Sequence, residues 1–216
     1  MKLIFHAHTK SSIDCELELE QIANKCNQLG IDAVLLTDHD RLSPSKKING
    51  VQFYPGEEIM TKQGEIIGLF LKEEIQPGLT ASDTIAKIKQ QNGLVTIPHP
   101  FDRFRSSALD KKIIEKHLDK IDIIETYNAR NLVDKDNKKA KEFFEENKQD
   151  YNLVEIVGSD AHILSGFENT CIEIEEFSDP QNFLENLKKA NFHQKKINLL
   201  QKIPPHIYTK GKKILN

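Results

Sequence analysis

Five apolar stretches of this chain end in histidine or carboxylate side chains, and this repeated pattern constrains the fold more than any other feature. The stretches cover residues 3–8, 33–40, 51–58, 94–99 and 153–162. Helical patterns separate most of them, as in parallel strands joined by crossover helices. The carboxyl ends of such strands meet at one rim of a barrel, so we expect these polar side chains to share one site.

Apolar residues that recur at helical spacing predict the crossover helices. We expect helices near residues 19–29, 80–93, 109–117, 140–144 and 180–190. Thr80 and Asp83 are typical of a capped first turn. Two more apolar runs, residues 65–71 and 121–125, add strands, and the first is the expected hairpin partner of residues 51–58. About seven strands favour a small or incomplete barrel over an eight-fold one.

The composition is that of an ordinary globular protein. The chain has 216 residues, a formal net charge of -3 and no apolar run of membrane-spanning length. We therefore expect a single domain over residues 1–216 and no membrane partner. Three widely spaced cysteines predict free thiols and a cytoplasmic location. Residues 186–216 hold eight lysines and no acidic residue, so we expect a basic, irregular C-terminal tail from about residue 191.

Metal-ligand residues one position apart are the strongest local signals. His6 and His8 are expected on one face of a strand, because side chains alternate along it. Asp160 and His162 repeat this spacing with a carboxylate, and His99 lies in an expected rigid, extended segment between two prolines. Imidazole and carboxylate without thiolate suit manganese, iron or zinc and argue against a structural zinc site.

The neighbouring carboxylates leave alternatives open. Asp38 and Asp40 flank His39 and could accept the second ring N–H of an imidazole, but aspartate is also typical of turns and helix caps. Glu57 and Glu58 lie on opposite faces of a strand, so only one of them can face the shared site.

In this order and at this spacing, the motifs closely resemble those of the PHP (polymerase and histidinol phosphatase) superfamily. They are His6-Ala7-His8-Thr9, Thr37-Asp38-His39-Asp40, Gly56-Glu57-Glu58-Ile59, Pro98-His99-Pro100 and Gly158-Ser159-Asp160-Ala161-His162. The resemblance covers essentially the whole chain. It implies an α/β fold of the distorted (β/α)7 barrel type, two or three bound divalent metal ions and hydrolysis of phosphate esters.

The resemblance also implies a set of metal ligands. They are His6, His8, Asp14, His39, Glu58, Glu65, His99, Asp160 and His162. Asp14 could instead cap the following helix. Glu65 stands where relatives of the small-phosphatase type often carry a histidine, so it is either a metal ligand or a solvated strand residue. The residues expected to take part in catalysis are His6, His8, His39, Asp160, His162 and Arg103.

Phosphate recognition requires cationic side chains beside the metal ligands. Arg103 and Arg105 follow the His99 motif, and Arg130 follows another strand end. Guanidinium groups suit phosphate, and Arg103 is the best-placed candidate, with Arg130 and Lys10 as further ones. The expected reaction is attack of metal-activated hydroxide on a small phosphomonoester, a nucleotide or a sugar phosphate.

Two other functions fit the same motifs. A nuclease or oligonucleotide 5′-end phosphatase could use the basic tail to follow a phosphate backbone, so nucleic acid is a possible partner. A non-catalytic subunit of a nucleic-acid-processing complex is the other alternative. Subunits of that kind tend to lose the metal ligands, whereas this chain retains nearly all of them.

Overall fold

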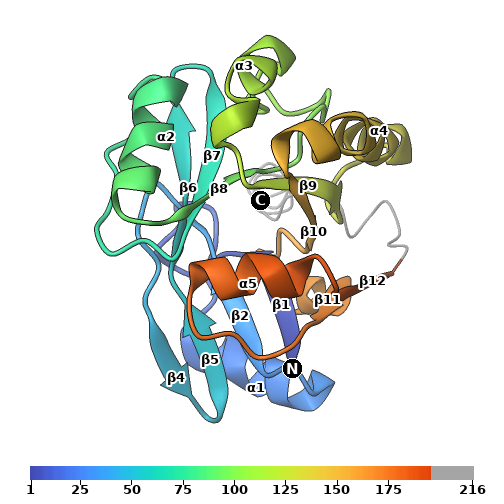
Figure 1. Ribbon diagram of the computed structural model, residues 1–216. Helices are drawn as coiled ribbons and strands as arrows, with labels where there is room; N and C mark the ends of the chain where they lie inside the picture. The colour runs from blue at the N-terminus through green and yellow to red at the C-terminus, as the bar shows by residue number, and fades with distance from the viewer. Residues whose placement is uncertain (196–216) are drawn as a thin grey trace, which may run out of the picture.

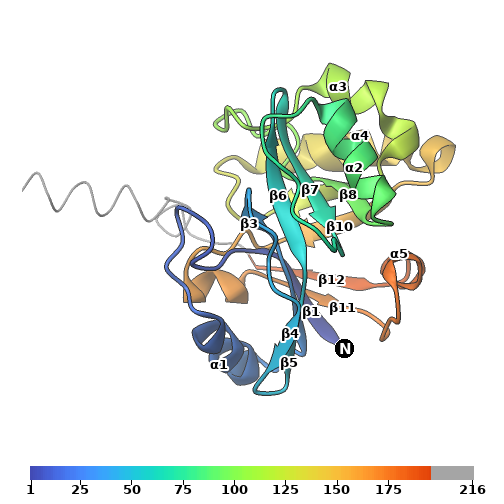
Figure 2. The same ribbon diagram turned by 90° about the vertical axis from the view of Figure 1, so that its left-hand side faces the viewer.

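The computed structural model describes residues 1–195, which form two mixed β-sheets and five α-helices (Figures 1 and 2). The strands are β1 (Lys2–Ala7), β2 (Ala33–Leu36), β3 (Asp38–His39), β4 (Lys46–Ile48), β5 (Val51–Tyr54), β6 (Gly56–Thr61), β7 (Gly64–Leu69), β8 (Leu94–Ile97), β9 (Ile123–Asn128), β10 (Val154–Gly158), β11 (Thr170–Glu173) and β12 (Asn191–Gln194). The helices are α1 (Leu19–Leu29), α2 (Ala81–Gln90), α3 (Lys111–Lys116), α4 (Asp134–Tyr151) and α5 (Pro180–Leu187), with 3-10 turns at Leu118–Lys120 and Leu164–Glu168.

The predicted α/β class is confirmed, but the sheets are mixed rather than parallel. One sheet has the order β12-β11-β1-β2-β5-β4 and the other β10-β9-β8-β7-β6-β3. Neighbouring strands run parallel in the pairs β1–β2, β2–β5, β3–β6, β8–β9 and β9–β10. Strand β7 is antiparallel to both β6 and β8, so the predicted hairpin is confirmed and interrupts the parallel pattern.

Backbone hydrogen bonds also join the two sheets where β1 ends. The amide of Ser159 donates to the carbonyl of Phe5 at 2.9 Å, and the amide of Ala161 donates to the carbonyl of His6 at 3.1 Å. The amide of His8 returns a bond to Ala161 at 3.0 Å. The first strand and the segment after β10 are thereby held side by side.

The predicted strand over residues 51–58 is two strands that belong to different sheets. Pro55 separates β5, which pairs with β2, from β6, which pairs with β3. Proline has no N–H to donate to a ladder, which favours a break at this point. A Cβ on Gly56 would lie 2.5 Å from the carbonyl oxygen of Leu36, so glycine is required. Glu58 therefore lies within β6, and our expectation that it ends a strand was wrong.

The C-terminal part of the described chain is more regular than expected. Residues 191–194 form β12, which pairs antiparallel with β11 in a register that places Cys171 opposite His193. The predicted irregular tail was therefore wrong at its start, because ladder bonding to β11 orders these four residues. The rest of that tail, residues 196–216, lies outside the described residues.

The helix ends follow the local sequence. The Thr80 hydroxyl accepts a hydrogen bond from the amide of Asp83, as the predicted cap requires. The Asp179 carboxylate accepts from the amide of Asn182 at the start of α5. Gly30 ends α1 with a φ of 67°, a left-handed conformation that glycine adopts without strain.

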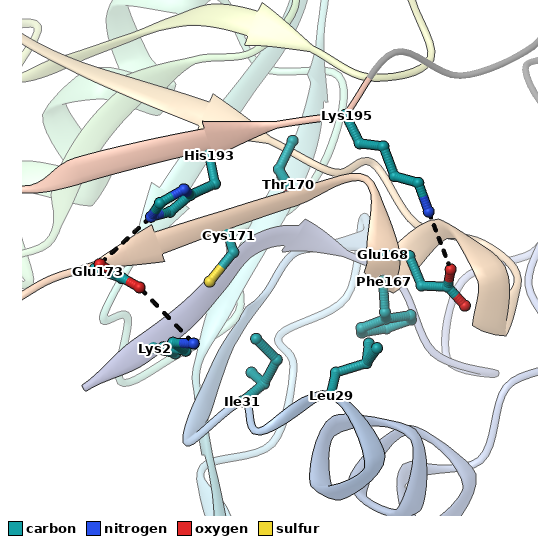
Figure 3. Close-up of a pocket in the computed structure, with 10 residues that line it drawn as sticks. All are labelled: Lys2, Leu29, Ile31, Phe167, Glu168, Thr170, Cys171, Glu173, His193 and Lys195. Atoms are coloured by element: carbon teal, nitrogen blue, oxygen red, sulfur yellow. Dashed lines mark hydrogen bonds and ion pairs between the residues drawn. The ribbon is translucent and has the colours of Figure 1, made fainter.

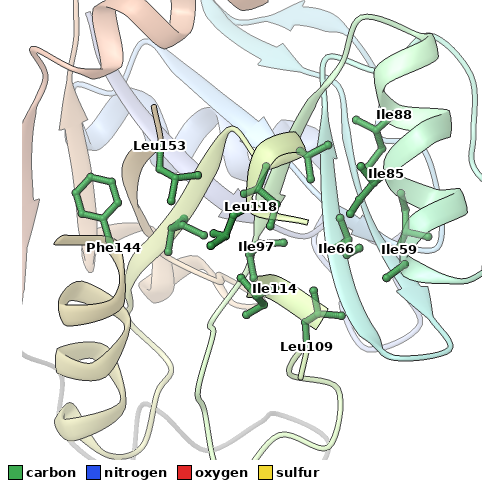
Figure 4. Close-up of a cluster of buried hydrophobic side chains, with 14 of the residues drawn as sticks. Ile59, Ile66, Ile85, Ile88, Ile97, Leu109, Ile114, Leu118, Phe144 and Leu153 are labelled. Atoms are coloured by element: carbon green, nitrogen blue, oxygen red, sulfur yellow. The ribbon is translucent and has the colours of Figure 1, made fainter. Parts of the chain in front are cut away.

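Apolar side chains fill the space on both sides of each sheet. Helices α2, α3 and α4 lie at the opposite end of the molecule from α1 in both views (Figures 1 and 2). Ile59 and Ile66 from the sheet pack with Ile85 and Ile88 of α2 in one of three buried clusters (Figure 4). None of the helices among residues 1–195 is long and apolar enough to cross a membrane. The three cysteines are free thiols, as predicted.

Adjacent residues on β6 allow a test of this packing. Ile59 is fully buried in the cluster, whereas Met60 points to the other face and is 37% exposed. We expect Ile59→Ala to lower the free energy of unfolding by about 2–5 kcal/mol, because it leaves a cavity. Met60→Ala, the matched control, should cost less than about 1 kcal/mol. Urea denaturation followed by circular dichroism measures both, and equal losses would contradict the assignment of faces.

Candidate metal centre

The nine predicted metal ligands lie in one cluster. Four sets of three donors have ligand atoms within 4.8 Å of one another. These sets are His8, His39 and His162; His6, His8 and Glu58; His6, His99 and Asp160; and His39, Glu58 and Glu65. Residues that are up to 154 positions apart in sequence, such as His8 and His162, therefore meet at one point of the fold.

Glu58 lies at the centre of the cluster. Its Oε2 is 3.2 Å from His6 Nε2, 3.3 Å from His39 Nδ1 and 3.5 Å from His8 Nε2. Its Oε1 is 2.9 Å from His99 Nε2. Burial would raise the pKa of Glu58, but His6 and His39 hold that pKa well below its ordinary range. The two oxygens face different imidazoles, an arrangement suited to a carboxylate that bridges two ions.

Asp160 supplies the second central carboxylate. Its Oδ1 is 3.6 Å from His8 Nε2, and its carboxylate also pairs with Arg105 and Arg130. Burial opposes ionisation, but the two guanidinium groups and His6 hold the pKa of Asp160 well below its ordinary value. Asp160 therefore stays ionised despite complete burial.

Asp14 belongs to the cluster rather than to a helix cap. Its Oδ2 is 3.1 Å from His162 Nε2, and its Oδ1 is 3.8 Å from His39 Nε2. Burial raises the pKa of Asp14, but the hydrogen bond to His162 and the neighbouring imidazoles together lower it by more, so the net shift is downward. Glu18, not Asp14, is the N-cap residue of α1.

Glu65 also faces the cluster, from β7. It is 5% exposed, with its carboxylate 3.5 Å from His99 Nε2 and 3.7 Å from His39 Nδ1. The alternative of a solvated strand residue is therefore wrong. Burial and the nearby charge of Glu58 raise the pKa of Glu65. A cation bound between the two carboxylates would relieve this repulsion.

Unpaired buried atoms provide a test of whether the cluster fits metal ions. His8 Nε2, Asp14 Oδ1 and Glu65 Oε2 are buried and have no hydrogen-bond partner among the described residues. Buried polar atoms are normally paired, so their lack of partners is costly. Burial, with the neighbouring His162 ring, lowers the pKa of His8, which favours the neutral form that binds metal. The donors therefore fit divalent ions.

The backbone is strained at three of the ligands. His6, His99 and Asp160 have positive φ angles of 62°, 30° and 49°. Such angles are costly for residues with a side chain and persist only where the surrounding structure imposes them. The backbone at His99 is therefore not extended, contrary to our prediction. The amide of His99 donates a hydrogen bond to a buried carboxylate, which holds this conformation. The strain turns ligands inward at strand ends.

That carboxylate is Glu125 on β9, a residue absent from the predicted site. Its Oε1 is 2.8 Å from His6 Nδ1, and its Oε2 accepts hydrogen bonds from the amide of His99 and from Asn128 Nδ2. A Cβ on Gly158 would lie 1.6 Å from Oε1, so glycine leaves room for the carboxylate. Glu125 orients His6 so that Nε2 faces the cluster. The position of Glu125 at the end of the predicted strand over residues 121–125 was the sequence signal that could have identified it.

Ser12 orients His8 in a similar way. Its hydroxyl lies 3.1 Å from His8 Nδ1 and donates to Asp38 Oδ1 at 3.0 Å. Asp38 itself contacts hydroxyl and amide groups, not an imidazole, so the proposed direct contact to His39 was wrong. Asp40, with a φ of 52°, accepts from the amide of Met60 in a turn.

The arginines are arranged differently from the prediction. The guanidinium of Arg103 pairs with Asp136, with Nη2 2.7 Å from Oδ1, and does not reach the cluster in the described structure. Arg105 points inward to Asp160 instead. Arg130 Nη1 is 2.9 Å from Asp160 Oδ1 and 2.8 Å from His162 Nδ1. Arg130 therefore lies beside the cluster, where a phosphate-binding residue was expected.

Lys10 also lies apart from the cluster. Its Nζ pairs with Glu18 at 2.8 Å, and its side chain is largely exposed. His117 bonds to the carbonyl of Ile113, and His193 pairs with Glu173, so neither is among the cluster ligands, as expected. His206 lies outside the described residues.

A cleft of about 330 Å³ opens onto the cluster. Its lining is Asp14, His39, Glu65, Asp102, Phe104, Arg105, Ser106, Ser107, Arg130 and Leu132. A different hollow, beside β1, β11 and β12, is shown in Figure 3. There Glu173 pairs with Lys2 and His193, and Lys195 pairs with Glu168, so its charged groups largely neutralise one another. The cleft over the cluster is the candidate active site.

No protein-family model matches the chain. It is 37% identical over 149 residues to an uncharacterized protein of Methanocaldococcus jannaschii, covering 62% of this chain and 86% of that protein. A second uncharacterized protein of the same organism is 33% identical over 201 residues, and the match covers 87% of this chain and 79% of that protein.

Solved structures are similar in fold at low sequence identity. A two-domain protein of Bacteroides vulgatus that contains a predicted PHP-like metal-dependent phosphoesterase matches with a TM-score of 0.63 and 17% identity, over 94% of this chain and 68% of that chain. A protein of Bifidobacterium adolescentis named as a metal-dependent phosphoesterase matches with a TM-score of 0.59 and 12% identity, over 86% and 95%.

The role of Glu125 can be tested through metal binding. We expect Glu125→Gln to weaken manganese binding about 10- to 100-fold, because His6 loses the carboxylate that orients it. Glu155→Gln on neighbouring β10, where the carboxylate bonds to Thr126 and Lys141, is the control and should leave affinity unchanged. Isothermal titration calorimetry of the folded variants measures the difference, and unchanged affinity in Glu125→Gln would refute this role.

Glu57 makes the stability of the metal-free protein depend on pH. It lies on the other face of β6, as predicted, and burial raises its pKa from 4.5 to about 7. Between these values the unfolded carboxyl is ionised while the folded one keeps its proton, so stability falls as pH rises. We expect Glu57→Gln to remove this part of the slope between about pH 4.5 and 7. Thermal denaturation across that pH range measures the stability of the wild type and of both variants, with exposed Glu73→Gln as the control. If the stability of Glu57→Gln depended on pH as that of the wild type does, Glu57 would not be the cause of the slope.

Proposed function

We propose that this chain, which belongs to the PHP superfamily and to one family with the two Methanocaldococcus jannaschii proteins, is a metal-dependent phosphoesterase that hydrolyses a small phosphomonoester. The observation that carries the proposal is the cluster of nine nitrogen and oxygen ligands beneath two inward-pointing arginines. We expect a nucleotide or sugar phosphate as substrate, and two or three ions of manganese, iron or zinc.

We also propose that the strands around the site form the distorted seven-stranded barrel of this superfamily. The order β1, β2 continued by β3, β6, β7, β8, β9 and β10 accounts for seven positions. The parallel bridge between Ala7 and Ala161 supports closure between the first and last of them. Such closure explains why ligands from so many strands meet on one side.

Divalent ions, when bound, polarise phosphoryl oxygens and lower the pKa of water. The side chains divide the remaining work. Glu58 and Asp160 would supply negative charge that attracts the ions, and the imidazoles would hold them as neutral nitrogen ligands. Glu125 and Ser12 hold His6 and His8 in orientation. This arrangement would bring the ions to the floor of the cleft.

Arg105 and Arg130 are the proposed phosphate-binding groups. Both line the cleft, and both are held in place by Asp160. Guanidinium groups offset charge on the non-bridging oxygens of a phosphoryl group as it is transferred. Arg103 and Lys10 are less suitable because neither lines the cleft, and their side chains pair with Asp136 and Glu18 instead.

The alternatives have weaker support. A nuclease would need a surface that follows a phosphate backbone, and most of the basic segment proposed for that purpose, residues 196–216, lies outside the described residues. A non-catalytic subunit would not need a cluster of nine mostly buried potential ligands, some of which have unpaired donor atoms. The free thiols favour a reducing, cytoplasmic location for the enzyme.

The two arginines of one loop provide a matched test of activity. Arg105→Ala should lower kcat/KM for phosphomonoesters by about 100-fold, because a phosphate-binding charge is lost. Arg103→Ala should stay within about threefold of the wild type, since Arg103 pairs outside the cleft. Asp160→Asn should abolish turnover and lower metal content. Steady-state kinetics and elemental analysis measure these effects; a greater loss in Arg103→Ala than in Arg105→Ala would reverse the assignment.

A further inference from the structure

The lining of the cleft includes exposed apolar side chains. The large hydrophobic side chains exposed among the described residues are Ile13, Met60, Phe104, Leu132, Tyr151 and Ile163. Five of them stand within two positions of a ligand or an inward-pointing arginine: Met60 on β6 follows Glu58 by two positions, and the other four lie in loops. Ile13 precedes Asp14, Ile163 follows His162, Phe104 precedes Arg105, and Leu132 follows Arg130 by two positions. Two of these four, Phe104 and Leu132, line the cleft itself.

The Phe104 ring and the Arg105 guanidinium are placed by the same buried carboxylate. Asp102 is 4% exposed, and its Oδ1 accepts a hydrogen bond from the amide of Phe104 at 3.0 Å. Its Oδ2 accepts from Nε of Arg105 at 3.1 Å. One loop thus presents a guanidinium toward the cluster and, one residue earlier, a phenyl ring that is 62% exposed.

Packing among residues 1–195 does not account for this exposure. Phe101, three residues earlier, packs edge-to-face against Phe143, and Leu109 is buried in the core. Burying a phenyl ring is favourable, so an aromatic side chain left open beside a polar site is unusual. Leu132 follows the other cleft arginine and adds a second apolar surface to the same cleft.

From this juxtaposition we propose that Phe104 and Leu132 determine specificity and that the substrate is a phosphate ester whose leaving group carries a planar ring. The inference rests on the proposed phosphoesterase function. Arg105 and Arg130 would hold the phosphoryl group over the cluster, and the leaving group would extend outward against the two apolar side chains. Aromatic faces bind planar rings by stacking.

The size of the cleft agrees with a small ester. About 330 Å³ is near the lower end of the range for small-molecule sites. A nucleobase and a simple aryl group share the required chemistry, so the experiment must distinguish them. A polyol such as a bare sugar would meet two side chains that offer no hydrogen bonds and would gain little from them.

The first experiment compares substrates with manganese-loaded protein. The pairs are phenyl phosphate with glycerol 1-phosphate, and adenosine 5′-monophosphate with ribose 5-phosphate. We expect the ring-bearing member of each pair to have the higher kcat/KM, by about tenfold or more. A preference for phenyl phosphate alone would indicate an aryl ester, and a preference for the nucleotide alone would indicate a base. Equal rates for sugar phosphate and nucleotide, with no aryl preference, would overturn the inference.

Variants at Phe104 and Leu132 test whether these side chains cause the preference for ring-bearing substrates. Phe104→Ala should lower kcat/KM for the ring-bearing substrates about tenfold and leave ribose 5-phosphate within twofold, whereas Phe104→Tyr should retain the wild-type preference. Leu132→Ala should act in the same direction. Tyr151→Ala, an exposed aromatic at the end of α4, is the matched control and should change nothing. A Phe104→Ala enzyme with unchanged preferences would refute the assignment.

Binding separates this inference from the proposed function. Phenylphosphonate and methylphosphonate cannot be hydrolysed at an ester bond, and calorimetry measures their affinities for the metal-loaded protein. We expect tighter binding of phenylphosphonate, lost in Phe104→Ala. If the protein hydrolyses phosphomonoesters but binds both phosphonates equally, only the inference fails. If no phosphomonoester is hydrolysed and neither phosphonate binds, the proposed function fails and the inference fails with it.

Discussion

Concentrated buried charge is the constraint on which the rest of the molecule depends. Glu58 and Asp160 are removed from water, yet imidazole and guanidinium groups hold both of them ionised. Buried carboxylates are tolerated only when they are paired, so each needs several partners at fixed distances. Strands that are distant in sequence must therefore end, or pass, at the same point. The hairpin of β6 and β7 brings in two of the carboxylates, and the parallel strands bring in the rest.

The strain and the outer hydrogen bonds follow from that requirement. Strand geometry alone would turn alternate side chains away from the centre, so His6, His99 and Asp160 adopt left-handed backbone conformations. Their positions are then maintained from behind, by Glu125 beneath His6 and His99 and by Ser12 beneath His8. The apolar clusters on the far sides of the sheets supply the stability against which such strain can persist.

Much of this site could be predicted because local sequence carries the relevant signal. Ligand residues follow apolar runs, and the period of two along a strand separates Glu57 from Glu58. Glu125 escaped prediction because a lone carboxylate near a strand end is common, and its role depends on His6, 119 positions away. The choice between Arg103 and Arg105 depends on the conformation of one loop, in which Asp136 takes one guanidinium and Asp160 the other.

The sequence by itself determined the α/β class, the cap residues of several helices, and the identity and order of the histidines and carboxylates that meet in the cluster. These features depend on the residue types and on contacts between near neighbours along the chain. Only the tertiary structure decided that residues 51–58 divide between two sheets, that β11 and β12 extend one of them, and which arginine faces the cleft. Those outcomes depend on pairing between distant segments, whose energies are not encoded in any local pattern.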